Sequence, residues 1–347
     1  MIPTVCYALF ALAILKHSKS ALIGLYHLYY LKESNMNKLV ILTGPTAVGK
    51  TALSIALAKK IGGEIISADS MQVYKHMDIG SAKIRPDEME GIPHHLIDIL
   101  DPREDFNVFL FQKYAKEAME SIYANGHIPI LVGGTGFYIQ SVLYDIEFTE
   151  NNADESYRSQ LEKIATMKGV SYLHKMLKEV DEKSADSIHP NNVKRMIRAL
   201  EYHHLTGQKI SEHNMEERQK KSPYDFSYFV LHDERSRLYH NIDLRVDQMM
   251  QNGLVEEVKK LKDMGLKREN VSMQGLGYKE ILDYLDGITD FDRAIYLIKR
   301  DTRHFAKRQL TWFRREKDVI MIDKQDFHYD NQAILDYMLS IINKSKQ

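Results

Sequence analysis

The chain has 347 residues, of which 44% are hydrophobic and 27% are charged. This composition excludes a disordered or low-complexity protein, and the length allows a large α/β domain together with a smaller lobe. The single cysteine, Cys6, excludes a disulfide framework and a cysteine-based zinc site. Because such cysteine usage fits a reducing compartment, we expect a cytoplasmic protein.

The first 35 residues differ in character from the rest of the chain. The apolar run 2–15 contains 14 residues and ends at Lys16 and His17. A membrane-spanning helix needs about 20 apolar residues, and no basic region or clear cleavage pattern flanks the run. We interpret residues 1–35 as a mis-assigned start or a poorly ordered extension and expect no membrane association. A membrane anchor is the alternative.

The segment 44–51, GPTAVGKT, fits the phosphate-loop pattern G-x-x-x-x-G-K-[ST] without a mismatch. It follows the apolar run Leu39–Leu42 and opens a helix-like stretch, as the pattern requires. Two glycines permit a tight path with inward N–H groups, Lys50 adds positive charge, and the Thr51 hydroxyl can bind Mg²⁺. The loop therefore predicts a diphosphate or triphosphate ligand. The residues expected to bind it are Gly44, Pro45, Thr46, Ala47, Val48, Gly49, Lys50 and Thr51.

Two more strands are expected in the first half of the chain, at 64–70 and 127–136. Between them, the stretch 112–126 has helical periodicity and a glycine stop. Alternating strands and helices predict an α/β fold with a P-loop NTPase-like parallel sheet flanked by helices. Ligands bind at the carboxyl ends of such strands, so Asp69 and Thr135 are expected near the phosphate loop.

The pattern changes between about residues 147 and 223, where amphipathic helices follow one another without a convincing strand. We therefore expect a helical insertion domain at 147–223. The catalytic core would consist of residues 37–146 and 224–345, with further strands at 224–234 and 319–323.

Several polar residues are candidates for chemistry at the sheet edge. The strand that runs into Gly133 and Gly134 ends without an acid, so ATP hydrolysis is not expected. Asp69 can accept a proton from a nucleophile opposite the phosphates, or can simply cap its loop. Arg245, after a later strand, can reach a pyrophosphate. The adjacent His94 and His95 lack a third ligand, which favours structural histidines.

Positive charge is concentrated in two helical stretches although the chain carries a net charge of −1. The stretch 299–317 holds eight Lys or Arg against two acids, a local charge of +6. Lys194 and Arg198 share one helix face, where a solvated charged surface is the alternative to a binding surface. Aromatic residues near these stretches can stack on RNA bases or belong to the core. They are Tyr278, Trp312 and Phe313.

Eight segments resemble, in chain order, the tRNA dimethylallyltransferases, the bacterial tRNA isopentenyltransferase family. They are GPTAVGKT, ISADSMQVYKHMDIGSAK, PHHLIDILDP, PILVGGTGFYIQSVL, IHPNNVKRMIRALE, RVDQMMQNGLVEEV, QGLGYKE and AKRQLTWFR. The resemblance implies transfer of a dimethylallyl group from dimethylallyl diphosphate to N6 of adenosine 37, in tRNAs that read codons beginning with U. It also implies Mg²⁺, release of pyrophosphate, binding of the tRNA anticodon stem-loop, and a monomer without an obligate protein partner.

The resemblance assigns roles to matching residues. Asp69 resembles the residue that accepts the N6 proton, Thr135 the residue that approaches the target nucleotide, and Arg245 the residue that grips the diphosphate together with Lys50. The implied tRNA contacts are Asp69, Ser70, Met71, Gln72, Thr135, Lys194, Arg195, Met196, Ile197, Arg198, Gln274, Gly275, Leu276, Gly277, Tyr278 and Lys279. Asn241 departs from relatives that carry an arginine at this position, and the zinc finger of eukaryotic members is absent.

Three alternatives remain open at the level of the sequence. An adenylate isopentenyltransferase shares the phosphate loop and the reaction but acts on a free nucleotide. A small-molecule kinase would place ATP in the same loop, with Asp69 as base toward an alcohol. A non-enzymatic RNA-binding regulator would keep the fold alone.

Overall fold

The computed structural model describes residues 37–148, 155–217 and 219–344. The expectation for residues 1–35 lies outside the described residues. Contacts divide the described chain into two compact parts, an α/β unit formed by residues 37–139 and 223–344, and a helical unit formed by residues 140–222. The boundaries expected from the sequence were 147 and 223.

The α/β unit contains a six-stranded sheet with the order β3-β2-β4-β1-β5-β6, in which all paired strands are parallel. The strands are β1 (Lys38–Thr43), β2 (Gly63–Ala68), β3 (His94–His95), β4 (Ile128–Gly133), β5 (Asp225–His232) and β6 (Val319–Asp323). The predicted parallel α/β fold is thus confirmed. Strand β3 was not predicted, because two histidines carry no strand signal.

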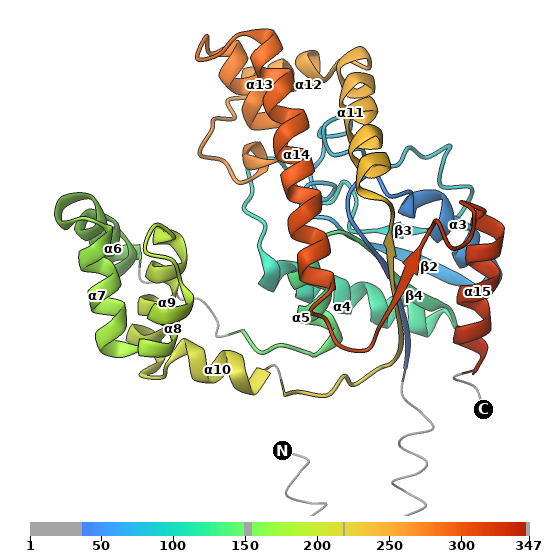
Figure 1. The fold of residues 1–347 in the computed structure, drawn as a ribbon, viewed down its shortest axis with the longest axis horizontal. Coiled ribbons are helices and arrows are strands. Elements are labelled where there is room, and N and C mark those ends of the chain that lie inside the picture. Colours follow the sequence, from blue (N-terminus) through green and yellow to red (C-terminus); the bar gives the residue numbers. More distant parts are fainter. Residues whose placement is uncertain (1–36, 149–154, 218, 345–347) are drawn as a thin grey trace, which may run out of the picture. The chain divides into compact units, whose positions relative to one another are not determined.

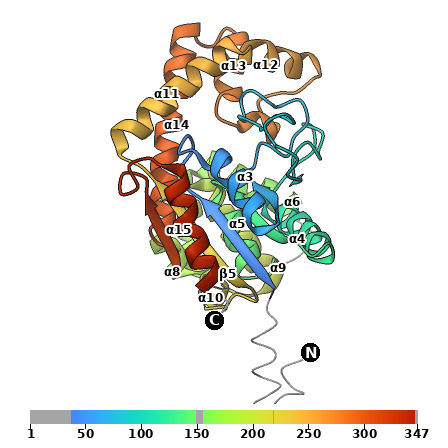
Figure 2. The ribbon, with the colours of Figure 1, turned by 90° about the vertical axis from the view of Figure 1, so that its right-hand side faces the viewer.

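Helices cover both faces of this sheet, as a parallel sheet requires. The helices of the α/β unit are α3 (Lys50–Ile61), α4 (Val108–Ala124), α5 (Gly136–Leu143), α11 (Arg235–Gln251), α12 (Leu254–Asp263), α13 (Tyr278–Leu285), α14 (Phe291–Phe313) and α15 (Asn331–Lys344). Helices α3 and α15 lie side by side (Figure 2) and share one core with Val40 and Leu42 of β1. The alternate residues Leu39 and Ile41 are buried on the other face.

Glycines determine where the first crossover helix begins and ends. Gly49 precedes α3 with φ of 94°, and Gly62 follows it with φ of 65°. Both values lie in the left-handed region that other residues avoid. The phosphate loop therefore leads directly into α3, the helix labelled in Figure 1. The N–H groups of the loop lie at the positive end of that helix.

The helical unit has its own apolar core. Its helices are α6 (Glu155–Lys168), α7 (Val170–Val180), α8 (Glu182–Ser187), α9 (Val193–Thr206) and α10 (Ile210–Glu217). Leu161, Leu173, Leu177, Met196 and Leu200 are buried together where α6, α7 and α9 meet. None of the helices in the described parts of the chain combines the length and the apolar character that a membrane crossing requires.

A buried carboxylate joins three helices of this unit. Asp181 is 1% exposed and accepts hydrogen bonds from the backbone N–H and side-chain hydroxyl of Ser184, at 3.0 and 2.7 Å. It also accepts from the backbone N–H and hydroxyl of Ser211, at 2.9 and 2.7 Å. Burial alone would raise the pKa of Asp181, but these four donors outweigh it and lower the pKa below its ordinary value.

Replacing Asp181 with asparagine is expected to destabilise the helical unit by about 1–3 kcal/mol at pH 7, because the amide cannot accept all four donors. A carboxylate with a lowered pKa stabilises the fold above its unfolded pKa, and the stabilisation is lost as pH falls through the folded pKa. The difference between Asp181→Asn and the wild type should therefore shrink on acidification. Urea unfolding at several pH values measures this difference in the free energy of unfolding. The variant Asp186→Asn, at an exposed aspartate of the same unit, is the matched control.

Candidate active site at the phosphate loop

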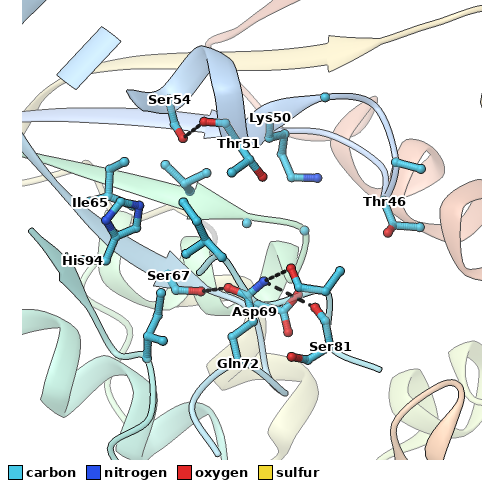
Figure 3. Close-up of a pocket in the computed structure, with 18 of the residues that line it drawn as sticks. Thr46, Lys50, Thr51, Ser54, Ile65, Ser67, Asp69, Gln72, Ser81 and His94 are labelled. Carbon is cyan, nitrogen blue, oxygen red and sulfur yellow. Dashed lines mark hydrogen bonds between the residues drawn. The ribbon is translucent and has the colours of Figure 1, made fainter. Parts of the chain in front are cut away.

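A cavity of about 130 Å³ lies beneath the phosphate loop at the carboxyl ends of the central strands (Figure 3). Eight residues expected at the site from the sequence line it: Thr46, Ala47, Gly49, Lys50, Thr51, Asp69, Gln72 and Arg245. These come from the phosphate loop, the start of α3, the segment after β2, and α11. The predicted residues Gly44, Pro45, Val48, Ser70, Met71 and Thr135 are not among the described residues that line the cavity.

The phosphate loop has the tight backbone path that its glycines predicted. Gly44 has φ of 145° and packs so closely against the carbonyl of Leu231 that a Cβ atom there would overlap it. The Lys50 ammonium folds back and donates to the carbonyl oxygens of Gly44 and Pro45, at 3.0 and 2.8 Å. On the outer side, Lys324 donates to the carbonyl of Val48 at 3.2 Å.

The charge of Lys50 depends on what occupies the cavity. Burial and the neighbouring Arg245 lower the pKa of Lys50 to about 7, and Asp69 opposes this shift. Near neutral pH the side chain therefore exchanges between the charged and the neutral form. A bound diphosphate would favour the charged form, because opposite charges attract strongly in a buried site.

Asp69 follows β2 and enters the cavity opposite Lys50 (Figure 3). Its Oδ1 atom accepts a hydrogen bond from the N–H of Met71 at 2.8 Å, which orients the carboxylate. Burial raises the pKa of Asp69, while the backbone N–H groups of Met71 and Gln72 and the cations Lys50 and Arg245 act in the opposite direction. A buried carboxylate with a raised pKa is a suitable proton acceptor.

Arg245 reaches the cavity from α11. Its Nη1 atom lies 3.4 Å from the hydroxyl of Thr46, so the guanidinium lies at the mouth of the phosphate loop. Ion pairs on both sides hold this part of α11 against α14, with Asp243 2.5 Å from Arg303 and Asp247 2.6 Å from Lys299. The residue one turn earlier, Asn241, is not among the described residues that line the cavity.

Two features of the cavity were not predicted from the sequence. Gln309 of α14 contacts both the phosphate loop and the segment after β4. In addition, four apolar side chains form a slot beside the loop: Ile65, Ile84, Ile97 and Val132. His94 borders this slot, with its Nδ1 atom 2.8 Å from the carbonyl oxygen of Ile92. The one sequence signal for Gln309 is that it is uncharged in a strongly basic helix, which indicates a side chain that faces the protein interior.

The segment 274–279 supports the loop that follows Asp69. Tyr278 is fully buried, and its hydroxyl donates to Glu257 at 2.8 Å and accepts from the N–H of Ser81 at 3.1 Å. Glu257 in turn accepts the N–H groups of the residues 78–80, at 2.8 to 3.0 Å. The hypothesis that Tyr278 stacks on a base is therefore wrong, because its ring is enclosed by protein. The fully buried Phe313 is a core residue for the same reason.

The residues 194–198 lie on α9 in the helical unit. Met196 and Ile197 are buried in the core of that unit, whereas Lys194 and Arg195 are exposed. The helix thus presents cations on one side and apolar side chains on the other. A ligand that bound the exposed side of α9 would therefore contact Lys194 and Arg195.

Part of the basic stretch 299–317 is neutralised within the α/β unit. Lys299 and Arg303 pair with acids of α11, and Arg300 pairs with the adjacent Asp301 at 2.8 Å. The exposed cations for which no ion pair is found among the described residues are Lys307, Arg308, Arg314, Arg315 and Lys317. The cations of this stretch that are available to an anionic ligand therefore lie in its second half.

Comparison with known proteins adds independent information. The family model described as IPP transferase matches residues 72–316, and the model described as isopentenyl transferase matches residues 37–101. A tRNA dimethylallyltransferase of Lachnoclostridium phytofermentans is 60% identical over 311 residues, which cover 90% of this chain and 99% of the relative.

Solved structures of similar proteins have the same fold. The tRNA isopentenylpyrophosphate transferase of Bacillus halodurans is 46% identical, with a TM-score of 0.67 over 89% of this chain and 98% of that one. The tRNA delta(2)-isopentenylpyrophosphate transferase of Staphylococcus epidermidis is 40% identical, with a TM-score of 0.66 over 89% and 99%. A eukaryotic dimethylallyltransferase acting on tRNA is 32% identical, with a TM-score of 0.72 over 83% and 74%. The chain therefore belongs to the IPP transferase family.

Proposed function

We propose that the protein transfers the dimethylallyl group of dimethylallyl diphosphate to N6 of adenosine 37 in tRNAs that read codons beginning with U. The products are N6-dimethylallyladenosine and pyrophosphate. The observation that carries this proposal is that a phosphate loop, the partly buried carboxylate of Asp69 and an apolar slot line one cavity. Such a cavity fits a donor that has an anionic and an apolar end.

The diphosphate of the donor would lie against the phosphate loop. Backbone N–H groups at the start of α3, Lys50 and Arg245 supply positive charge where negative charge develops on the leaving pyrophosphate. The five-carbon tail would enter the slot that contains Ile65 and Val132. An apolar tail buries its surface there, whereas the ribose and base of ATP would not find polar partners on these side chains.

Mg²⁺ fits this site through the Thr51 hydroxyl, which lines the cavity. Within the described residues no group of three or more His, Cys, Asp or Glu is arranged to hold a metal ion. The ion would thus rely on Thr51, diphosphate oxygens and water, a ligand set that Mg²⁺ commonly adopts. When bound, it neutralises charge on the leaving group.

Asp69 would accept the proton of the attacking amine. The lone pair of adenine N6 is delocalised into the ring, so the amine attacks well only if a base removes its proton as the bond forms. The N6–C1 bond forms, the C1–O bond to diphosphate breaks, and the proton moves to the Asp69 carboxylate. Burial makes this carboxylate a stronger base than an exposed aspartate.

The tRNA would be bound by basic surfaces outside the cavity. We propose that Lys194, Arg195 and Arg198 of α9 contact phosphates, and that Gln274 and Lys279 contact the RNA near the loop after Asp69. The segments 69–72 and Thr135 would contact the target nucleotide, which has to leave the base stack at a cost of roughly a few kcal/mol. A free-nucleotide acceptor would need none of these surfaces, which favours tRNA over AMP.

Asp69→Asn is expected to reduce prenyl transfer about 100-fold or more, because the amide cannot accept the N6 proton. Transfer is measured with dimethylallyl diphosphate, Mg²⁺ and unmodified tRNA that carries A36-A37-A38, with AMP and ATP as parallel substrates. Asp87→Asn, an exposed aspartate in the same unit, is the matched control. A variant that kept its rate would contradict the role of Asp69 as base, and transfer to AMP alone would indicate the free-nucleotide reaction.

Lys50 should take up protons when a diphosphate binds. With a free-protein pKa of about 7, about half a proton is expected at pH 7 and nearly a whole one at pH 8. Affinity should correspondingly fall as pH rises above 7. Calorimetry of pyrophosphate binding in buffers of different ionisation enthalpy measures the uptake. The variant Lys50→Arg keeps its charge at all these pH values, so it should take up no proton at residue 50 when pyrophosphate binds. Any protonation of pyrophosphate itself is the same with both proteins. The difference in proton uptake between wild type and variant therefore reports on Lys50.

The two halves of the basic stretch 299–317 should respond differently to loss of charge. Replacing the exposed Arg314 and Arg315 with glutamine is expected to weaken tRNA binding and to reduce the slope of log K against log salt by about 1–2. Lys299→Gln removes a cation already paired with Asp247 and should leave that slope nearly unchanged. Filter binding at several salt concentrations measures both, and equal slopes in the two variants would exclude Arg314 and Arg315 as tRNA contacts.

A further inference from the structure

Gln309 is a buried, uncharged residue near the C-terminal end of the basic helix α14, with 6% of its surface exposed. Its Oε1 atom accepts a hydrogen bond from the N–H of Thr46 in the phosphate loop at 2.9 Å. Its Nε2 atom donates to the carbonyl oxygen of Gly134 at 2.9 Å. One planar amide therefore joins two loops that are separated by almost 90 residues in the sequence.

The two loops lie on different sides of the reaction proposed above. Thr46 belongs to the loop that would hold the diphosphate, and its hydroxyl lies 3.4 Å from Arg245. Gly134 precedes Thr135, whose N–H donates to the carbonyl oxygen of Ala68 at 3.3 Å, one residue before Asp69. The Gln309 amide thus links the leaving-group side of the cavity to the strand ends that carry the base.

The contact requires an amide of this length. A carboxylate at the same position offers acceptors only, and an apolar side chain offers neither a donor nor an acceptor. Gly134 approaches so closely that a Cβ atom there would overlap the Gln309 amide nitrogen, and Gly136 packs as closely against Trp312. Gly134 and Gly136 of the segment GGTG are therefore needed for the approach of α14.

Helix α14 is a rigid support for this amide. Ala306 and Phe313, one turn to either side of Gln309, are fully buried. Asp243 and Asp247 pair with α14 and tie it to the helix that carries Arg245. A helix anchored at several points can hold a side chain within the small tolerance that catalysis demands.

We propose that Gln309 is a positioning residue that fixes the separation between the phosphate loop and the segment 133–136, and thereby aligns the leaving diphosphate with the acceptor nucleotide. The inference rests on the proposed prenyl transfer. Gln309 acts through the two loops, so its loss should affect the rate at saturating substrate more than binding of either substrate. A misplacement of about 1 Å can cost on the order of 100-fold in rate.

The test compares wild type, Gln309→Leu, Gly134→Ala and the double variant in prenyl transfer to tRNA. Gln309→Leu is expected to lower kcat about 10- to 100-fold with little change in KM for tRNA. The double variant should be no slower than the slower single variant, because both changes disrupt the same contact. Gln332→Leu, at an exposed glutamine of α15, is the matched control.

Pyrophosphate binding supplies a readout independent of turnover. The proposal expects Gln309→Leu to bind one pyrophosphate per chain with an affinity close to that of the wild type. A kcat equal to that of the wild type would overturn the proposal. A joint fall of kcat and of binding stoichiometry would also overturn it, because that result indicates partial unfolding. If the wild type binds pyrophosphate but prenylates no tRNA, the proposed function fails, and this inference fails with it.

Discussion

The organisation of this protein depends on three partly buried ionisable groups around one cavity. Lys50 and Arg245 both line the cavity as cations, and Asp69 alone cannot balance both charges. Each pKa is shifted toward the neutral form of its group by burial. An anionic ligand would stabilise the charged lysine and arginine, so the cavity is electrostatically suited to a diphosphate.

The surrounding fold holds these groups at fixed positions by close backbone contacts. The phosphate loop packs on the end of β5 through Gly44, and the segment after β4 packs on α14 through Gly134 and Gly136. Glu257 and Tyr278 support the loop after Asp69. Rigid elements therefore determine the relative positions of donor-binding and base-carrying segments, although none of these supports contributes chemistry itself.

Helix α14 combines two roles that its sequence alone did not separate. Its buried face bears Gln309 and Phe313, which contact loops and core. The exposed cations of the stretch 299–317 that form no ion pair within the described residues lie in the last turns of α14 and just after its end. The first half uses its cations in ion pairs with α11. Net charge in a stretch of sequence is consequently a poor guide to the charge available to a ligand, because neighbouring elements can neutralise it.

The sequence by itself determined the phosphate loop, the parallel α/β sheet and the candidacy of Asp69, because these depend on short patterns of glycine, apolar residues and strand ends. Tertiary structure decided what distant residues do. It buried Tyr278 against Glu257 and Phe313 in the core, and it brought Gln309 to Thr46 across 263 positions of the chain. Local propensity and periodicity describe neighbours along the chain, whereas these contacts arise only when helices pack on the sheet and exclude water between them.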